Sequence, residues 1–338
     1  SKVRRFEKEL LEYLKANTNI ELNGEKSVGA YASGANGVIT SEGKIKFLKE
    51  NSIGLYGAKG ATINDKTASM DFTNANAKNN IGAYLAGAKW VDSRSGAYTF
   101  SLNHAGNNIY LFAQGGNDGT TDLGSTATLN NEFKVNPSGS ATSTAKAIGM
   151  YFNTAVKDKT TFVDNTLNMT ASNAKISVTN SGIGVYAKNT TGSGKNNIIN
   201  KINVSSSESG SVGVFTDGNL KLSGTGGLIE AQNAGIGLYG NKGTVTVEGT
   251  HKVEVSSAGT GMYLTKGSHL SGGKLELENK TAGTSAAGIY YEGTGNEVNH
   301  DTDIVVTAGE NLLALYANGL KLNNNKEIII KKGKNNVK

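Results

Sequence analysis

Two short stretches of this chain carry the side chains best suited to binding chemistry. The first contains Trp90, Tyr98 and His104, with Asp92 and Arg94 close to them in sequence. An exposed tryptophan beside hydrogen-bonding groups can stack on a sugar ring, so these residues are candidates for a ligand-binding site. A lone tryptophan is also often buried in a core, and that alternative stays open.

The second stretch runs from Gln114 to Ser125 and adds Asn117, Asp118 and Asp122 as candidate ligand-binding residues. Its Gly-Gly-Asn-Asp-Gly run is similar to the repeats that bind calcium in β-rolls, but those repeats need tandem copies whose carboxylates share an ion. This single imperfect copy predicts a plain loop. We therefore expect no metal ion and no cofactor.

Elsewhere the acidic residues show no catalytic pattern. Asp301 and Asp303 would point the same way on a strand, but no neighbouring repeat supplies the partners that acid/base catalysis needs. No nucleophile, phosphate-loop or dinucleotide motif occurs in a suitable context. We expect that the chain is not an enzyme. Four glutamates alternate with apolar residues, as on the solvated face of a sheet: Glu248, Glu254, Glu276 and Glu278.

Composition argues against several other classes of partner. The four histidines (His104, His251, His269 and His300) lack short metal-ligand spacing, and His251 and His269 are expected to face solvent. The net charge of +6 comes partly from the chain ends, and basic residues do not alternate with aromatic ones, so no nucleic acid is expected. No stretch approaches the ~20 apolar residues of a membrane span. The chain has no cysteine, which excludes disulfides and thiolate metal sites.

A repeated phrase of four residues, aliphatic-Gly-aliphatic-aromatic, must build the scaffold that positions these side chains. Nine copies contain the glycine, and two others, which end at Tyr110 and Tyr316, lack it. Subtracting successive aromatic positions gives steps of 25, 28, 26, 41, 35, 29, 24, 24, 27 and 26, a period typical of stacked repeats. The copies with glycine end at Tyr31, Tyr56, Tyr84, Tyr151, Tyr186, Phe215, Tyr239, Tyr263 and Tyr290.

One period, residues 235–259, contains three short segments with strand character and three glycine-containing corners. This pattern predicts an all-β fold, a right-handed parallel β-helix with about 25 residues per turn. A propeller blade needs about 40 residues, and a leucine-rich repeat needs leucines at fixed offsets, so neither fits. Strand alternation places Ile53 and Leu55 inside, with Gly54 and Tyr56 outside in a column of aromatic rings. A bend at the glycine that turns the tyrosine inward is the alternative.

The chain divides into three parts in this prediction. Residues 1–19 form an amphipathic helix, with Val3, Phe6, Leu10 and Leu14 on one face, that caps the open end of the first turn. The alternative for this helix is a partner-binding or coiled-coil segment. Residues 20–325 form the β-helix, with loop insertions near 113–147 and 187–200. Such insertions can carry recognition, and the alternatives are neutral drift of a surface loop or a long period that contains an extra turn. Residues 326–338 form a basic tail.

The phrase Ile-Gly-Leu-Tyr-Gly and the following Lys-Gly-Thr-Val-Thr-Val-Glu-Gly, within residues 236–249, resemble passenger domains of large Gram-negative autotransporters of the type V secretion pathway. The resemblance is strongest to very large fusobacterial outer-membrane adhesins, and it covers about residues 20–325. It transfers no binding residue, because the repeat is scaffold. The family's signal peptide and C-terminal membrane barrel are not in this sequence, so we expect a fragment of a larger protein.

This resemblance implies a virulence-associated adhesin segment on the bacterial surface, anchored in the outer membrane through the missing barrel. Its β-helical shaft would present loops that attach to host cells or other bacteria through glycan or protein receptors. Two alternatives stay open. One is a secreted toxin subunit of vacuolating type, and the other is a β-helical enzyme that cleaves polysaccharides.

Overall fold

The computed structural model describes residues 19–103, 106–138, 147–190, 193–295 and 297–337, and within these ranges every regular element is a β-strand. The predicted capping helix, apart from Asn19, lies outside the described residues. The strands form a parallel β-solenoid of about 11 turns, in which the phrase-bearing strands repeat once per turn. The chain divides into two units, Ser1–Ala174 and Lys175–Lys338.

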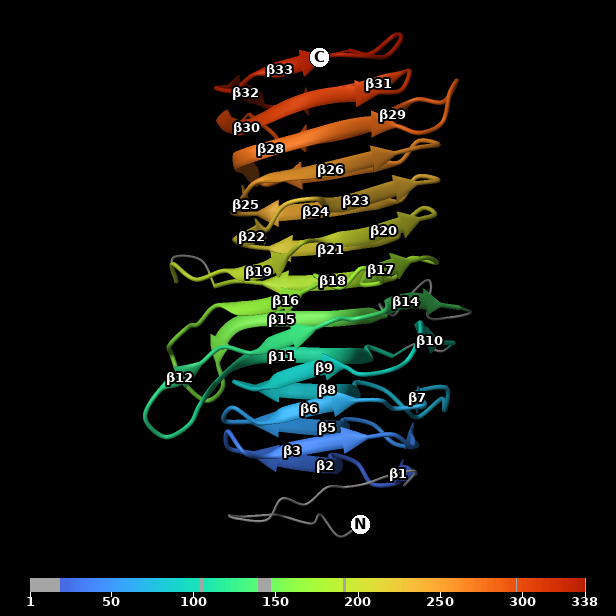
Figure 1. Ribbon diagram of the computed structural model, residues 1–338, viewed down its shortest axis with the longest axis vertical. Helices are drawn as coiled ribbons and strands as arrows, with labels where there is room; N and C mark the ends of the chain where they lie inside the picture. The colour runs from blue at the N-terminus through green and yellow to red at the C-terminus, as the bar shows by residue number, and fades with distance from the viewer. Residues whose placement is uncertain (1–18, 104–105, 139–146, 191–192, 296, 338) are drawn as a thin grey trace. The chain divides into compact units, whose positions relative to one another are not determined.

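The walls of the first unit are parallel sheets whose strands lie one above another (Figure 1). Its first wall carries the repeated phrase and consists of β2 (Val28–Ser33), β5 (Ile53–Ala58), β8 (Ile81–Ala86), β11 (Ile109–Asn117) and β15 (Ile148–Val156). Its second wall consists of β3 (Val38–Ser41), β6 (Thr62–Asp65), β9 (Lys89–Asp92), β13 (Thr126–Thr128) and β16 (Asn165–Asn168). Its third wall contains β1 (Ile20–Leu22), β4 (Lys44–Phe47) and β7 (Ser69–Asp71) in one ladder, and β10 (Tyr98–Leu102) and β14 (Glu132–Pro137) in another.

The second unit repeats this plan. Its phrase-bearing wall consists of β18 (Ile183–Lys188), β21 (Val212–Asp217), β24 (Ile236–Lys242), β27 (Thr260–Thr265), β29 (Ala286–Glu292) and β31 (Leu312–Asn318). The other walls contain β19 (Asn197–Asn200), β22 (Leu220–Ser223), β25 (Thr244–Val247) and β32 (Lys321–Asn324), and β17 (Lys175–Val178), β20 (Asn203–Ser207), β23 (Gly227–Gln232), β26 (Thr250–Val255) and β33 (Ile328–Ile330). Two long strands, β28 (His269–Asn279) and β30 (Glu297–Ala308), serve both of these walls.

The glycine of the phrase faces the interior, which corrects the predicted alternation. Leu55 is fully buried as expected, but Ile53 is only half-buried and Gly54 is buried. The ladder pairs Ile53 and Leu55 with the next turn but skips Gly54, so the side-chain alternation is interrupted there. A Cβ on Gly54 would lie 2.6 Å from the Gly82 carbonyl oxygen, which explains why the position is a glycine.

The aromatic residues of the phrase form a half-buried outer column, as predicted. In the second unit, successive ring centroids are 4.9–5.2 Å apart from Tyr186 to Tyr316. Each such pair contributes about 0.5–1.5 kcal/mol beyond its buried area. Because the rings contact one another, mostly stacked face to face or tilted, the column stabilises the scaffold.

The fourth copy of the phrase is aligned differently from the prediction. Phe112, not Tyr110, pairs with Tyr84 and stacks on it, with ring centroids 5.2 Å apart. Tyr110 lies between Ile109 and Leu111, where the other copies have glycine, and its side chain is fully buried. A large polar side chain therefore enters the solenoid interior at this turn.

Two predicted boundaries also change. The solenoid continues past residue 325, because β33 pairs with β30 and Val337 bridges to Leu313. Residues 113–147 and 187–200 are not simply loops, because they include the wall strands β13, β14 and β19. These strands were not recognised in the sequence because each is only three to six residues long.

Candidate functional site

The structure separates the predicted site residues into two groups, both in the first unit. Trp90 and Tyr98 lie in the interior, whereas Asn117, Asp118 and Asp122 lie on a surface hairpin. His104 lies outside the described residues. No single site therefore unites the candidates that the structure describes.

Trp90 is fully buried, so its indole faces are not available to stack on a sugar. The indole Nε1 instead donates a hydrogen bond to Asp65 Oδ2 over 3.1 Å. Tyr98 is 9% exposed, and its hydroxyl accepts a hydrogen bond from the Met70 amide over 2.8 Å. Trp90 follows the buried alternative rather than the sugar-stacking one, and both residues belong to an internal polar network.

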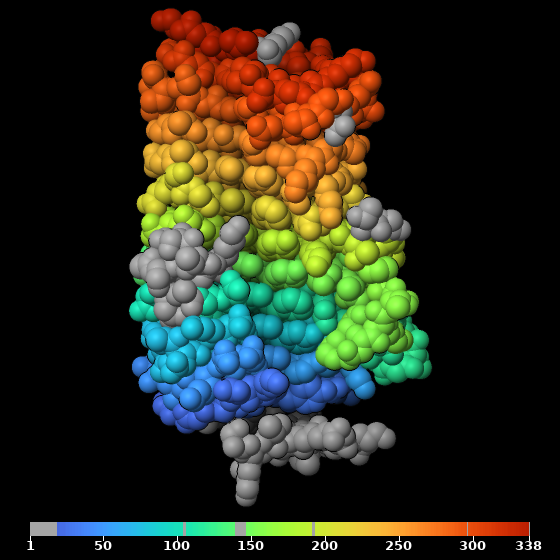
Figure 2. All heavy atoms as spheres, turned by 180° about the vertical axis from the view of Figure 1, so that it is seen from behind, coloured from blue at the N-terminus to red at the C-terminus, as the bar shows by residue number. Residues whose placement is uncertain are grey.

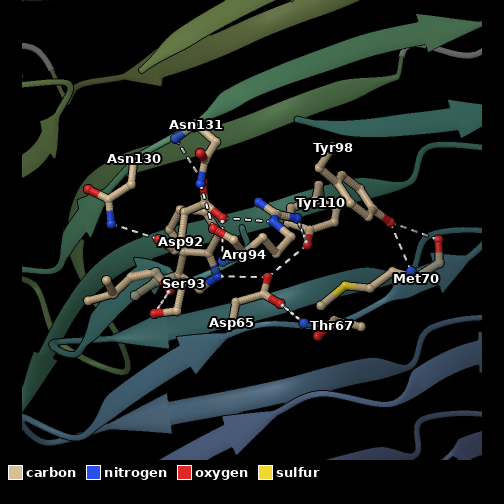
Figure 3. Close-up of polar contacts among 12 residues, drawn as sticks. Asp65, Thr67, Met70, Asp92, Ser93, Arg94, Tyr98, Tyr110, Asn130 and Asn131 are labelled. Carbon is tan, nitrogen blue, oxygen red and sulfur yellow. Dashed lines mark hydrogen bonds and ion pairs between the residues drawn. The ribbon is translucent and has the colours of Figure 1, made fainter. Parts of the chain in front are cut away.

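Arg94 occupies the centre of this network (Figure 3). Its Nε donates to Asp92 Oδ1 and its Nη1 to the Tyr110 hydroxyl, each over 2.7 Å. Its guanidinium carbon lies 4.3 Å from the centroid of the Tyr98 ring, a cation–π contact. The Arg94 side chain is only 8% exposed, so this cation depends on protein groups rather than water.

The two aspartates are held by complementary donors. Asp65 accepts hydrogen bonds from the Tyr110 hydroxyl over 2.7 Å and from the Thr67 amide over 2.9 Å. Asp92 Oδ2 accepts from the Asn131 amide and side chain over 3.0 and 3.2 Å. Below we call Asp65, Trp90, Asp92, Arg94, Tyr98, Tyr110 and Asn131 the Arg94 network.

Three groups of the Arg94 network, Arg94, Tyr98 and Tyr110, have raised pKa values. Burial by itself lowers the pKa of Arg94, but electrostatic interactions with Tyr110, Asp65 and Asp92 outweigh it and raise that pKa. Burial, followed by the Asp65 charge, raises the pKa of Tyr110 well above its ordinary value. Burial also raises the pKa of Tyr98 to about 12. Arg94, Tyr98 and Tyr110 therefore hold their protons near neutral pH.

Sequence reasoning missed Asp65 and Tyr110, although a signal was present. In β6, Asp65 shares strand parity with Ile63, and in β9 Asp92 shares it with Trp90. Alternation therefore placed both aspartates on the buried face. Tyr110 was missed because the phrase was aligned on its ring rather than on the flanking residues Ile109 and Leu111.

The predicted loop residues lie on a hairpin that leaves the wall at the end of β11 (Figure 1). The end of β11 pairs antiparallel with β12 (Asp122–Leu123), and the Asn117 side chain donates to Asp122 Oδ1 over 2.7 Å. Asp118 Oδ1 accepts from the amides of Thr120 and Thr121, each over 2.8 Å. These hydrogen bonds lower the pKa of Asp118, and the one from Thr121 has the largest effect on it.

A second excursion, missed by sequence reasoning, leaves the next turn of the first unit. At the end of β15, Ala155 bridges antiparallel to Phe162, and the Val156 amide donates to the Thr161 carbonyl over 3.0 Å. Residues 118–121 and 158–161 read Asp-Gly-Thr-Thr and Asp-Lys-Thr-Thr, and all eight residues are exposed. Below we call these two segments the paired turns.

The second paired turn contacts Asp122, which directly follows the first, and Figure 2 shows the atoms in the colours of these residues projecting from one side of the first unit. Asp122 Oδ1 accepts from Lys159 Nζ over 3.3 Å. A hydrogen bond from the Thr161 side chain, followed by those from Asn117 and Lys159, lowers the pKa of Asp122. The result is a compact surface of threonine hydroxyls and carboxylates, held by local hydrogen bonds.

The described residues were also compared with the requirements of metal sites and membrane-spanning helices. No group of three His, Cys, Asp or Glu side chains there is placed to hold a metal ion. The described part of the chain also contains no helix with the length and hydrophobicity needed to cross a membrane.

Two histidines of the second unit are fully buried, which corrects the predicted exposure of His251. The interior has room for the His251 ring because its partner in the adjacent strand is Gly227. A Cβ added at Gly227 would lie 2.4 Å from His251 Nδ1. His300 Nε2 lies 2.7 Å from the Thr302 carbonyl oxygen, so this nitrogen carries the hydrogen. His300 Nδ1 then accepts from the Tyr291 hydroxyl over 2.9 Å.

Because these two histidines are buried, we expect the second unit to lose stability in mild acid. Burial lowers the pKa of both His251 and His300 below 6.5, and hydrogen bonds to backbone carbonyls oppose this only in part. The unfolded chain, with histidine pKa values near 6.5, therefore binds more protons as the pH falls. We expect full stability above about pH 6.5 and a decline as the pH drops from there toward the folded-state values.

Chemical unfolding of the second unit, followed by hydrogen exchange of β26 and β30 between pH 7.5 and 5, measures this effect. The double variant His251→Gln/His300→Gln removes both titrating groups and should flatten the profile. A wild-type profile that stays level over this range would contradict the prediction.

No protein-family model matches the chain, and a search of curated proteins finds no match.

Proposed function

We propose that this chain is a non-catalytic segment of a cell-surface adhesin, in which the β-solenoid is scaffold and the paired turns bind a receptor. The observation that carries the proposal is the repeated Asp-x-Thr-Thr sequence at residues 118–121 and 158–161, whose side chains are exposed on adjacent excursions. Surface loops on rigid scaffolds commonly carry recognition. The receptor would be a glycan or protein on host cells or other bacteria.

In this proposal the chain belongs to the passenger domain of a large autotransporter adhesin of fusobacterial type and is displayed outside the cell. Its solenoid would be a right-handed β-helix with about 25 residues per turn. Two pairings between adjacent turns support that length, because Val28 pairs with Ile53 and Ile236 pairs with Thr260. The sequence phrase of residues 236–249 supports the family.

Removing the side chains of the paired turns is expected to weaken receptor binding. Asn117 and Asp122 are paired across the first hairpin, so residues 118–121 can be replaced by Asn-Gly, a favoured two-residue turn. Residues 158–161 keep their length, because Ala155 already pairs with Phe162 across this tight turn, and each of the four is replaced by alanine. Binding to glycan and receptor arrays should fall at least roughly tenfold, because exposed loop side chains supply the contacts.

A matched control shortens the turn at residues 281–284 of the second unit, and its binding should match that of the unaltered chain. Trp90 fluorescence and far-ultraviolet circular dichroism check that each variant keeps its fold. Undiminished binding by the variant without paired turns would reject them as the receptor site. Deleting residues 114–140 is less informative, because it also removes β13 and β14.

A further inference from the structure

In a repetitive solenoid, a strand can pair with the wrong turn, because successive turns present similar surfaces. In the first unit, successive phrase-bearing strands place a glycine and an aliphatic residue inward, as with Gly54 and Leu55 or Gly82 and Ala83. Backbone hydrogen bonds between parallel strands do not depend on side-chain identity. If a strand pairs with the turn after next, it meets a similar apolar surface, so these contacts discriminate weakly between registers.

The Arg94 network differs from this apolar background and spans three successive turns. Asp65 in β6 and Asp92 in β9 are direct partners in the ladder, so two carboxylates lie on adjacent turns. Tyr110, one turn further along in β11, donates its hydroxyl hydrogen to Asp65. Arg94 lies between them and bonds to both Asp92 and Tyr110. In the second unit, the last inward positions of β22 and β25 are instead apolar, Leu222 and Val247.

The contacts of the Arg94 network form only when the three turns are stacked in their native order. If β6 paired with β13 and the intervening turn were expelled, Asp65 would lose Trp90 and the Tyr110–Arg94 link, and a buried carboxylate would face Leu129. An isolated buried charge is strongly unfavourable, whereas a buried ion pair adds little net stability over apolar residues. The network therefore penalises wrong registers more than it stabilises the correct one.

We propose that the Arg94 network is a register key, a buried ionic cluster that selects the native stacking of three otherwise similar turns in the first unit. Its orphan donor fits this role. Arg94 Nη2 is buried without a hydrogen-bond partner among the described residues. A cluster that tolerates such a loss is not optimised for stability alone.

Cysteine pairs can report the register directly, because the natural chain has no cysteine. Thr62 and Lys89 are native partners, and Lys89 in turn pairs with Thr126. A disulfide between cysteines at 62 and 89 thus reports the native order, and one between 62 and 126 reports a skipped turn. The second bond cannot form across two native turns, because their spacing of about 10 Å exceeds the reach of a disulfide.

Each cysteine pair is placed in the natural chain and in the neutral variant Asp65→Asn/Asp92→Asn/Arg94→Met, and all proteins are refolded from denaturant under oxidising conditions. We expect the neutral variant to form at least roughly tenfold more 62–126 disulfide than the chain with the intact network. The variant Leu55→Ala, which destabilises the core but keeps the network, should form no more of it than the natural chain.

Two results would overturn the proposal. In the first, the neutral variant refolds at the natural rate with only the 62–89 disulfide, which would make the network dispensable for register. In the second, neither this variant nor its apolar counterpart Asp65→Leu/Asp92→Leu/Arg94→Met folds, which would make the network a requirement for stability instead.

Discussion

Replacing Arg94 with methionine is expected to lower the free energy of unfolding of the first unit by about 3–5 kcal/mol. The substitution keeps most of the side-chain volume but removes the cation that bonds to Asp92 and Tyr110 in an almost fully buried setting. Asp65 and Asp92, neighbours in the ladder, would then lie inside the solenoid without a compensating charge. Methionine also leaves the Tyr110 oxygen without its donor.

Trp90 is the single tryptophan of the chain and belongs to the same network, so its fluorescence during guanidinium unfolding reports this unit. Lys46→Met, at an exposed position of β4, is the matched control and should change stability by no more than about 0.5 kcal/mol. If Arg94→Met costs less than about 1 kcal/mol, the Arg94 network does not hold charge in the way described. Restoring stability by also neutralising Asp65 and Asp92 would confirm that the unpaired carboxylates cause the loss.

Replacing Leu238 with aspartate is expected to unfold several turns of the second unit. Leu238 is fully buried and pairs with Val214 on one side and Met262 on the other. The change removes a core side chain, which alone costs about 2–5 kcal/mol, and adds a buried charge without a partner. Because each turn depends on contacts with its neighbours, the loss should spread to β21 and β27.

Ile236→Asp in the same strand provides the control, because Ile236 is only half-buried and its new carboxylate can reach water. We expect it to cost about 1 kcal/mol. Thermal melting and hydrogen exchange of β21, β24 and β27 compare the two variants. Equal damage from both would mean that the interior side of β24 has been assigned incorrectly.

The repetitive scaffold follows from local sequence. Alternating apolar and polar residues, corner glycines and a phrase that recurs at a regular spacing predict stacked strands wherever the pattern occurs. Like residues then become neighbours on adjacent turns, which is why the outer column of aromatic rings was predictable. The second Asp-x-Thr-Thr turn was also present in the sequence, and the prediction overlooked it.

The Arg94 network depended on the tertiary structure. Its bonds join residues far apart in sequence, such as Tyr110 and Asp65 at a separation of 45 residues, and no local pattern relates them. Tyr110 lies inside because its strand aligns through Ile109 and Leu111, and Trp90 is buried because Asp65 on the adjacent turn accepts its hydrogen. His251 is likewise buried because Gly227 leaves space in the neighbouring strand. Local periodicity determines that turns stack, whereas the space and hydrogen-bond partners offered by neighbouring turns decide which polar side chains enter the core.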